Sequence, residues 1–360
     1  MSSPKNHPVK GRGALDNPDN RFDSYSREAV DDGWGSLDVA ENPARELIRD
    51  SSRSVIVRNQ SPDVPFRQSI NPYRGCEHGC IYCFARPSHA YLGYSAGLDF
   101  ETRLHYKADA APILREELAA RSYQCEPIAL GVNTDAYQPA ERKLCITQEI
   151  LEVLVETRHP VSIITKGALI ERDLDLLQDL AGDGLVNVMV SLTTLDSQLA
   201  RRMEPRAASP ARRLALIETL HRAGIPTGVL MAPMIPYLND SELTSILEAA
   251  RAAGARHAGY VLLRLPHEVA GLFEDWLQAY YPNQAERVLN RIRDCRGGKL
   301  YDNRFGKRMR GEGIFADLIS RRFRLAVNKL AFPGIADLRC DLFKPPHVQE
   351  PQLDLFGDDV

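Results

Sequence analysis

Three cysteines lie close together in the string Cys76-Glu77-His78-Gly79-Cys80-Ile81-Tyr82-Cys83. They are spaced four and then three residues apart, which can place three thiolates around one face of a cubic iron–sulfur cluster. A [4Fe–4S] cluster normally takes four Cys ligands, and the next cysteine in the chain is the distant Cys125. The spacing therefore predicts a cluster held by Cys76, Cys80 and Cys83, with one iron left open to another ligand.

Two other interpretations of these cysteines exist. One is a zinc site with His78 or His89 as the fourth ligand, although structural zinc sites more often combine a Cys-x2-Cys pair with a distant second pair. The other is three unrelated cysteines in a loop. A disulfide scaffold is disfavoured, because the chain has seven cysteines, an odd number, in 360 residues.

The residues around the cysteines favour the cluster. The string Ser69-Ile70-Asn71-Pro72-Tyr73-Arg74-Gly75, then the cysteines, then Phe84-Ala85-Arg86-Pro87, resembles the radical S-adenosylmethionine (SAM) superfamily. It is most similar to a largely uncharacterised bacterial branch often labelled spore photoproduct lyase-like or DNA repair photolyase. Tyr82, just before the third cysteine, stands where these proteins keep an aromatic residue beside the adenine of SAM.

This resemblance implies a [4Fe–4S] cluster and SAM as cofactors, with an electron donor as a partner. In the superfamily, SAM chelates the open iron, and one electron cleaves its sulfonium to release a 5′-deoxyadenosyl radical. We therefore expect a radical-SAM enzyme, a lyase or a transferase, that abstracts hydrogen from an unidentified substrate, with DNA repair or nucleic-acid modification as the first class to test. The alternative is a clamp- or nucleic-acid-associated binding protein whose iron–sulfur cluster is structural or redox-sensing.

Composition and hydropathy predict a cytoplasmic protein without a membrane partner. The chain is 44% hydrophobic, which is enough for a sizeable core, and its formal net charge is −3. No apolar run reaches membrane-spanning length, and the first residues show no apolar segment of a secretory signal.

Short apolar runs alternate with amphipathic stretches along the middle of the chain. The runs are rich in Val and Ile and suit parallel strands buried on both faces; they lie at 66–71, 127–132, 161–165, 186–192, 226–232 and 259–263. Six β/α units predict an α/β fold, a partial TIM-like (β/α)6 barrel with its chemistry at the C-terminal ends of the strands. Ser209-Pro210 should begin a helix that closes at Gly224, and Asn239-Asp240 should cap a helix that runs to Gly254.

We expect four regions along the chain. They are an irregular N-terminal arm (1–60), the radical-SAM core (61–281), a basic helical extension (282–342) and a flexible acidic tail (343–360). Within the arm, Lys10-Gly11-Arg12-Gly13-Ala14 resembles the N-terminal arm of the same bacterial branch.

SAM contacts are expected in the loops that follow the strands. After the run 127–132, Thr134 and Asp135 match the polar pair that binds the SAM amino group in the superfamily, because a hydroxyl and a carboxylate can accept bonds from an ammonium. A simple turn is the alternative. At the same rim Ser191 could bond the ribose and Arg264 the carboxylate; Lys166, Thr193 and Glu204 also lie there. No catalytic residue is assigned beyond the cluster.

One departure from the photolyase pattern concerns the hydrogen donor. Spore photoproduct lyases carry Cys-Thr-Ser-Asp in the loop after the second strand, and that Cys returns a hydrogen atom to the substrate. Here Val132 takes the place of the thiol in Val132-Asn133-Thr134-Asp135, and valine does not readily donate a hydrogen atom. Thymine-dimer repair by that mechanism is therefore in doubt.

Residues 287–330 form a basic module. They hold thirteen Lys/Arg and four acidic residues, a net charge of +9, with Tyr301, Phe305 and Phe315 between them. Such a stretch can neutralise phosphates and stack bases, so it predicts nucleic acid as a partner. The alternative is a solvated helix face with salt bridges to the core.

The C-terminal end carries a short motif, Gln352, Leu353, Asp354, Leu355 and Phe356. It resembles the peptide by which bacterial repair and replication proteins bind the sliding clamp of DNA polymerase. A Gln amide can pair with backbone groups, and Leu and Phe can fill apolar pockets. The motif therefore predicts the clamp as a partner, with a tail that folds back on the protein as the alternative.

Overall fold

The structure is a computed structural model that describes residues 8–24 and 43–346. The clamp-like motif at 352–356 lies outside these residues. No helix within the described ranges is long and apolar enough to cross a membrane.

A seven-stranded sheet forms the centre of the fold, with the order β10-β9-β8-β7-β6-β3-β2. Its strands are β2 (Ile56–Arg58), β3 (Gln68–Ile70), β6 (Ile128–Leu130), β7 (Val161–Thr165), β8 (Val186–Ser191), β9 (Thr227–Met234) and β10 (His257–Leu262). All neighbours are parallel except β2, which is antiparallel to β3. All six predicted strands are present, and the predicted α/β fold is confirmed; in the described chain the edge strands β10 and β2 do not pair, so the barrel stays open.

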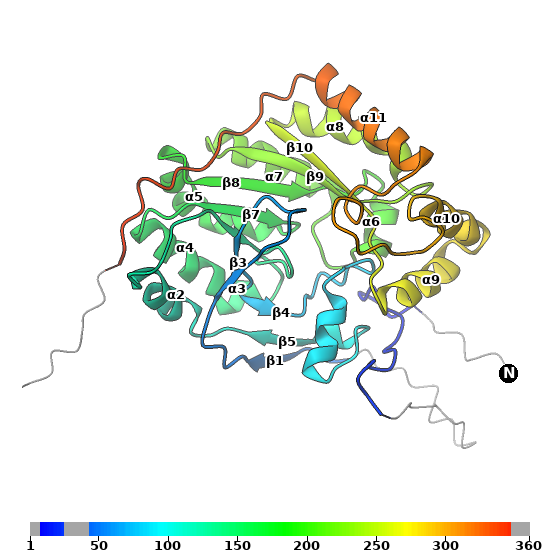
Figure 1. The fold of residues 1–360 in the computed structure, drawn as a ribbon, viewed down its shortest axis with the longest axis horizontal. Coiled ribbons are helices and arrows are strands. Elements are labelled where there is room, and N and C mark those ends of the chain that lie inside the picture. Colours follow the sequence, from blue (N-terminus) through cyan, green and yellow to red (C-terminus); the bar gives the residue numbers. More distant parts are fainter. Residues whose placement is uncertain (1–7, 25–42, 347–360) are drawn as a thin grey trace, which may run out of the picture.

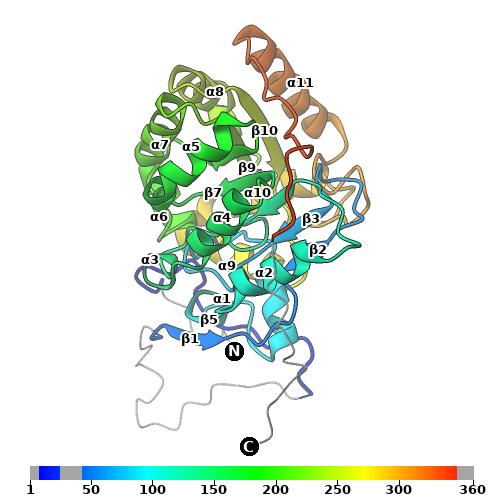
Figure 2. The same ribbon diagram turned by 90° about the vertical axis from the view of Figure 1, so that its left-hand side faces the viewer.

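Helices cover the outer face of this curved sheet (Figures 1 and 2). They are α2 (Ala110–Ala119), α3 (Glu141–Leu144), α4 (Ile146–Glu156), η2 (Ala168–Asp173), α5 (Leu174–Gly182), α6 (Ser197–Met203), α7 (Pro210–Arg222), η3 (Asp240–Glu242) and α8 (Leu243–Ala252). Strand residues such as Val161, Ile163 and Val188 are fully buried and share one core with Leu177 and Leu216 of the helices. Burial on both faces explains why these strands read as continuous apolar runs.

The two predicted helix starts have different outcomes. Ser209 caps α7 as expected, since its hydroxyl accepts a bond from the Arg212 N–H at 3.4 Å, and Gly224 follows the helix with a φ of +76°. The prediction that Asn239 caps the next helix is wrong. Its buried side chain instead accepts a bond from the Ile235 N–H at 2.6 Å, and the chain passes through η3 before α8 begins.

The predicted irregular arm contains two short strands. β1 (Glu46–Arg49) pairs in parallel with β5 (Arg103–Tyr106), which is antiparallel to β4 (Tyr73–Arg74), and β2 joins the edge of the main sheet. η1 (Arg86–Leu92) and α1 (Asp99–Thr102) lie between β4 and β5 along the chain. β1 and β2 are too short and too exposed to give a readable pattern, so their formation depends on their partners.

Helix α9 (Val269–Tyr280) ends the core region, and the C-terminal extension contains α10 (Pro282–Asp294) and α11 (Ile314–Lys329), with a basic loop between these two helices. This loop lies between the two open edges of the sheet. The Leu262 N–H at the end of β10 donates to the Met309 carbonyl at 2.9 Å, and Arg308 pairs with Asp63, in the β2–β3 connection, at 2.6 Å. Figures 1 and 2 show the orange loop beside the blue β2–β3 segment.

After α11 the chain runs back along the helical layer (Figure 1). The Arg339 N–H donates to the Gly184 carbonyl at 3.2 Å, and the Phe343 ring lies 5.5 Å from that of Tyr123 and 5.3 Å from that of His159. Residues 343–346, predicted to be flexible tail, are therefore packed on the core because Phe343 has an aromatic site to enter.

Candidate functional site

The three predicted cluster ligands lie in residues 75–85, the loop that joins β4 to η1. The loop is folded on itself, since the Cys83 N–H donates to the Cys80 carbonyl at 3.2 Å. Cys76 is fixed from the other side by a bond from its N–H to the Phe100 carbonyl at 2.9 Å. All three thiols are free; Cys76 and Cys80 are buried, and Cys83 is partly exposed.

The donor set suits a cluster better than a single metal ion. Within residues 8–24 and 43–346, no three His, Cys, Asp or Glu side chains converge closely enough to hold one ion. The histidines considered for zinc have other partners: His78 Nδ1 lies 3.3 Å from Asp135, and His89 Nε2 lies 2.9 Å from the Arg103 carbonyl. In a cubic cluster each thiolate binds a different iron, so convergence on one point is not required.

Burial opposes ionisation of these thiols. Desolvation, followed by the charge of Asp135 and the neighbouring thiols, raises the pKa of Cys76 well above its ordinary value. Desolvation also raises the pKa of Cys80 to about 12. The positive charge of iron must therefore create the thiolates when the cluster binds.

A buried ion pair holds the cluster loop from behind. Arg86 is fully buried, and its guanidinium donates to the Cys80 carbonyl at 2.9 Å and the Gly79 carbonyl at 3.2 Å. Its charge is balanced by Glu101, also fully buried, at 2.5 Å. The loop conformation thus depends on a charge pair that has no access to water, whose loss would be costly.

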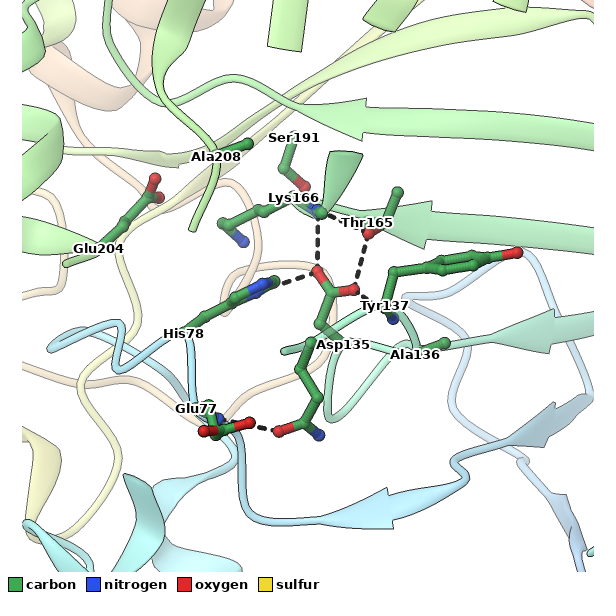
Figure 3. Close-up of polar contacts among 12 residues, drawn as sticks. Glu77, His78, Asp135, Ala136, Tyr137, Thr165, Lys166, Ser191, Glu204 and Ala208 are labelled. Carbon is green, nitrogen blue, oxygen red and sulfur yellow. Dashed lines mark hydrogen bonds and ion pairs between the residues drawn. The ribbon is translucent and has the colours of Figure 1, made fainter. Parts of the chain in front are cut away.

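Asp135 organises the rim above the loop (Figure 3). One carboxylate oxygen accepts bonds from the Thr165 hydroxyl at 2.7 Å and the Tyr137 N–H at 2.9 Å. The other accepts a bond from the Lys166 N–H at 2.7 Å and lies 3.3 Å from His78 Nδ1. Burial alone would raise the pKa of Asp135, but His78, the Lys166 N–H and the Thr165 hydroxyl outweigh burial and hold that pKa far below its ordinary value.

The other two polar side chains predicted for SAM lie nearby but differ in orientation. The Thr134 hydroxyl donates to the Tyr73 carbonyl at 2.6 Å, which leaves its oxygen as an acceptor. Ser191 is buried at the end of β8 and lies beside Lys166 in Figure 3.

Lys166 follows β7 and extends between His78 and Glu204 in Figure 3. Its ammonium lies 6.0 Å from the centre of the Tyr82 ring and makes no hydrogen bond or ion pair with another residue of the described chain. Burial would lower the pKa of Lys166, but the negative charges of Cys80, Glu204 and Asp135 outweigh burial and raise it, so the side chain stays cationic. It is therefore a positive group available to an anionic ligand.

Tyr82 is held by a second buried network. Its hydroxyl donates to Glu204, which also pairs with the buried Arg213. The Thr193 hydroxyl donates to Glu204 at 2.5 Å, and Arg213 donates to the Ser191 carbonyl at 3.1 Å. Burial would raise the pKa of Glu204, but Arg213 and Lys166 lower it to about 2, so the network keeps an ionised carboxylate beside the ring.

Arg264 lies at a different part of the rim. Its guanidinium stacks 4.7 Å from the centre of the Phe84 ring, directly after Cys83, and one terminal nitrogen lies 3.6 Å from the Met309 sulfur. Phe84 is 39% exposed although it is a large apolar side chain beside the cluster loop. This position favours contact with a substrate over contact with the SAM carboxylate.

The structure thus brings Tyr82, Asp135 and Ser191 together around Lys166, whereas Thr134 is bonded to Tyr73 and Arg264 is stacked on Phe84. Sequence reasoning missed three residues that support the site. Glu101 balances Arg86, His78 reaches Asp135, and the Gln138 side chain accepts a bond from the Glu77 N–H at 2.9 Å. These roles depend on contacts between residues that are distant in the sequence, and no local sequence motif identifies the residues in advance.

Comparison with known proteins agrees with the resemblance seen in the cysteine motif. The family model described as Radical SAM superfamily matches residues 70–250. An uncharacterized protein of Mycobacterium tuberculosis is 41% identical over 226 residues, which is 62% of this chain and 66% of that protein. The match thus spans just under two thirds of that relative's length. An uncharacterized protein of Methanocaldococcus jannaschii is 25% identical over 253 residues, 69% of this chain and 89% of that protein.

Solved structures share the fold. A spore photoproduct lyase variant superposes with a TM-score of 0.58 at 15% identity, covering 80% of each chain. Another spore photoproduct lyase variant, with bound AdoMet and dinucleoside spore photoproduct, superposes with a TM-score of 0.57 at 14% identity, covering 80% of this chain and 79% of that one.

Proposed function

We propose that this chain, which belongs to the radical SAM superfamily, is a radical-SAM enzyme with a [4Fe–4S] cluster and SAM as cofactors, and that its substrate is a nucleic acid. When bound, the two cofactors supply a carbon radical that abstracts hydrogen. The protein's part is to hold the cofactors, orient the substrate and keep water from the site.

We assign the cluster to Cys76, Cys80 and Cys83, and the SAM carboxylate to Lys166 in place of Arg264. Lys166 has no ion-pair partner within residues 8–24 and 43–346, whereas Arg264 is stacked on Phe84. A charge-assisted bond from a half-buried ammonium suits a carboxylate.

Thr134 and Asp135 remain the proposed acceptors for the SAM amino group. Asp135 already receives four contacts, about the number that two carboxylate oxygens can accept. The contact with His78 is the longest of them at 3.3 Å, so it is the one that an ammonium group would replace. Tyr82 would pack against the adenine, and Ser191 would bond the ribose.

The observation that carries the nucleic-acid proposal is a set of arginines stacked on exposed aromatic rings near the C-terminal ends of the strands. Arg264 lies 4.7 Å from the centre of Phe84, Arg287 of α10 lies 4.3 Å from Tyr237, and Arg308 lies 4.7 Å from Phe305. The three rings are 39%, 41% and 59% exposed. Nucleic acid suits such pairs, because a base can stack on each ring while the Arg264 and Arg287 guanidiniums bind phosphates; Arg308 is paired with Asp63, so its part is to orient the Phe305 ring.

Part of the basic module serves the protein itself, as the alternative interpretation anticipates. Six of its basic residues form ion pairs: Arg291, Arg293, Arg304, Lys307, Arg308 and Arg322. Arg296 is buried and donates to four backbone carbonyls, two in the basic loop and two at the end of β10. These contacts fix the loop at the rim and leave residues such as Arg287 and Lys299 to face a polyanion.

Val132 distinguishes this chain from the spore photoproduct lyases, which carry a hydrogen-donating cysteine at that position. A structural neighbour contains a dinucleoside spore photoproduct, which supports a nucleic-acid substrate. However, the half-buried Val132 cannot return a hydrogen atom as a thiol does. We therefore propose a different hydrogen-abstraction reaction on the nucleic acid.

The test uses anaerobically reconstituted enzyme with dithionite and SAM. Formation of 5′-deoxyadenosine is measured alone and with single-stranded DNA, duplex DNA or RNA, and deuterated oligonucleotides report transfer of deuterium into deoxyadenosine. We expect one class of nucleic acid to stimulate turnover and transfer its label. Arg287→Gln should weaken this stimulation, whereas Arg222→Gln, on the exposed side of α7 and paired with Glu218, should not. Stimulation by a peptide or protein fraction and by no nucleic acid would contradict the proposal.

A further inference from the structure

An N-terminal strap, residues 9–22, lies directly on the cluster loop although it is far from it in the sequence. Figure 1 shows it in dark blue beside α9 and the cyan segment that carries the cysteines. Its far end is tied by Arg21, which pairs with Glu268 before α9 at 3.0 Å and donates to the Pro87 carbonyl at 2.8 Å. The strap therefore spans the cluster loop from one side to the other.

Glu101 joins the strap to the loop. Its carboxylate accepts bonds from the Gly13 N–H at 3.0 Å and the Ala14 N–H at 2.9 Å, while it also balances Arg86 at 2.5 Å. Arg86 in turn holds the Cys80 carbonyl at 2.9 Å. One buried carboxylate thus connects the strap backbone to the backbone of a cluster ligand in two steps.

Two glycines show how closely the strap packs. A Cβ built on Gly13 would lie 1.8 Å from the Gly79 carbonyl oxygen, which belongs to the cluster loop. A Cβ built on Gly97 would lie 2.0 Å from the Asp16 carbonyl oxygen in the strap. Neither glycine has a positive φ, so backbone conformation does not require glycine at these positions. Glycine is required because a Cβ would clash with the neighbouring carbonyl oxygen.

The strap also completes the apolar surroundings of the cysteines. Ala14 is fully buried in one group of packed apolar side chains with Cys80, Ile81 and Tyr82, and Val9 packs against the same group. The apolar shell around an iron–sulfur cluster controls solvent access, and its backbone support holds the ligands in place.

From these contacts we propose that residues 9–22 are part of the cofactor site, a strap that positions the cluster loop and shields the cluster from solvent. Gly13 and Glu101 are its positioning residues. The proposal concerns retention of the cluster and does not depend on which substrate the enzyme uses.

The test uses two full-length variants that lift the strap from opposite sides, Gly13→Ala and Gly97→Ala. Gly182→Ala is the matched control, because the same change at that helical position meets nothing within 4 Å. Hydrogen exchange of the cluster-free protein, followed by mass spectrometry, reports whether residues 9–22 are released. Iron loss to a ferrous chelator from the reconstituted protein reports how firmly the cluster is held.

We expect both strap variants to exchange faster over residues 9–22 and to lose iron about tenfold faster, as for other outer contacts of metal ligands. Exchange elsewhere in the core should remain at the wild-type rate, which excludes general unfolding. The clash in Gly97→Ala is with the strap at Asp16 and not with the cluster loop, which separates it from the clash in Gly13→Ala. Faster exchange with iron loss at the wild-type rate would overturn the proposal, and so would a strap that stays protected in both variants.

Discussion

At the scale of residues, the rim is governed by carboxylates whose oxygens are already occupied. Asp135 and Glu204 are buried and ionised because each has several donors, and they surround Lys166 with negative charge. Lys166 thereby remains a half-buried cation without an ion pair in the part of the chain that the structure describes. Removing a charged group from water costs free energy unless the charge is paired, and a bound anionic ligand would supply that partner.

Replacing Lys166 by Met should therefore weaken SAM binding without removing the cluster. Loss of one charge-assisted hydrogen bond costs about 1.5–3 kcal/mol, so we expect the KM for SAM to rise about 10–100-fold. Turnover at saturating SAM should change little, because the contact is lost equally from ground state and transition state. Initial rates of deoxyadenosine formation, together with iron content, measure both effects.

The control is Lys143→Met, an exposed lysine of α3. An unchanged KM in Lys166→Met, with the iron content of the wild type, would contradict the assignment of this residue to the SAM carboxylate.

Single residues differ in how far the sequence predicts them. The cysteine spacing identifies its ligands directly, and Thr134, Asp135, Ser191 and Arg264 could be placed at the rim because strand ends can be read from apolar runs. Their partners could not be read, since Thr165 reaches Asp135 across 30 residues and Tyr82 reaches Glu204 across 122. The contact of Arg264 with Phe84 also joins residues far apart in the sequence, so it could not be read either.

At the scale of elements, strands buried on both faces were predictable and edge strands were not. β7 and β8 are continuous Val- and Ile-rich runs, whereas β1 and β2 have three or four residues and half-exposed side chains. Asn239 carries the signature of a helix cap, but its side chain accepts a bond from the Ile235 N–H and donates to the distant Thr193 carbonyl at 2.8 Å. Local signals fail where a distant partner competes for the same group.

The segment that follows α11 depends on a buried histidine. His159 lies between Phe343 and Tyr123, with Nε2 2.7 Å from the Tyr123 hydroxyl. Burial lowers the pKa of His159 from its ordinary value of 6.5 to about 4. Between these pH values the unfolded chain binds a proton that the folded chain rejects, so stability falls as pH falls.

We predict that the free energy of unfolding falls by about 3 kcal/mol because of His159 when the pH is lowered from 6.5 to 4. His159→Gln cannot take up that proton and should show a shallower dependence, while His89, whose pKa is also about 4, acts equally in both proteins. Urea unfolding of cluster-free protein at a series of pH values measures the difference. Equal slopes for wild type and variant would show that His159 does not carry the effect.

At the scale of the whole molecule, the C-terminal extension does two things. Its basic loop bridges the open edges of the barrel through Met309 and Arg308, and its helix α10 lies beside α9 at the C-terminal end of the strands (Figure 1). The loop is therefore part of the architecture of the site, and its remaining charge is presented next to the rim. This arrangement could not be foreseen from composition, which shows the charge but not its position.

We further propose that the clamp-like motif Gln352–Phe356 recruits the enzyme to the bacterial sliding clamp. Deleting residues 351–360 should abolish co-purification with the clamp and leave SAM cleavage unchanged, because the residues assigned to the cluster and to SAM lie between Cys76 and Ser191. Replacing Leu355 and Phe356 by Ala should have the same effect if the apolar side chains carry the contact. Undiminished clamp binding by the deletion variant would remove this partner.

The central claim is that Cys76, Cys80 and Cys83 hold a cluster with one iron open to SAM. Its most direct test is the electron paramagnetic resonance spectrum of the anaerobically reduced, reconstituted protein, recorded with and without SAM. We predict a [4Fe–4S] signal that changes when SAM is added and that is lost in Cys83→Ala. A protein that contains zinc instead of iron, or a cluster signal that does not respond to SAM, would contradict the account.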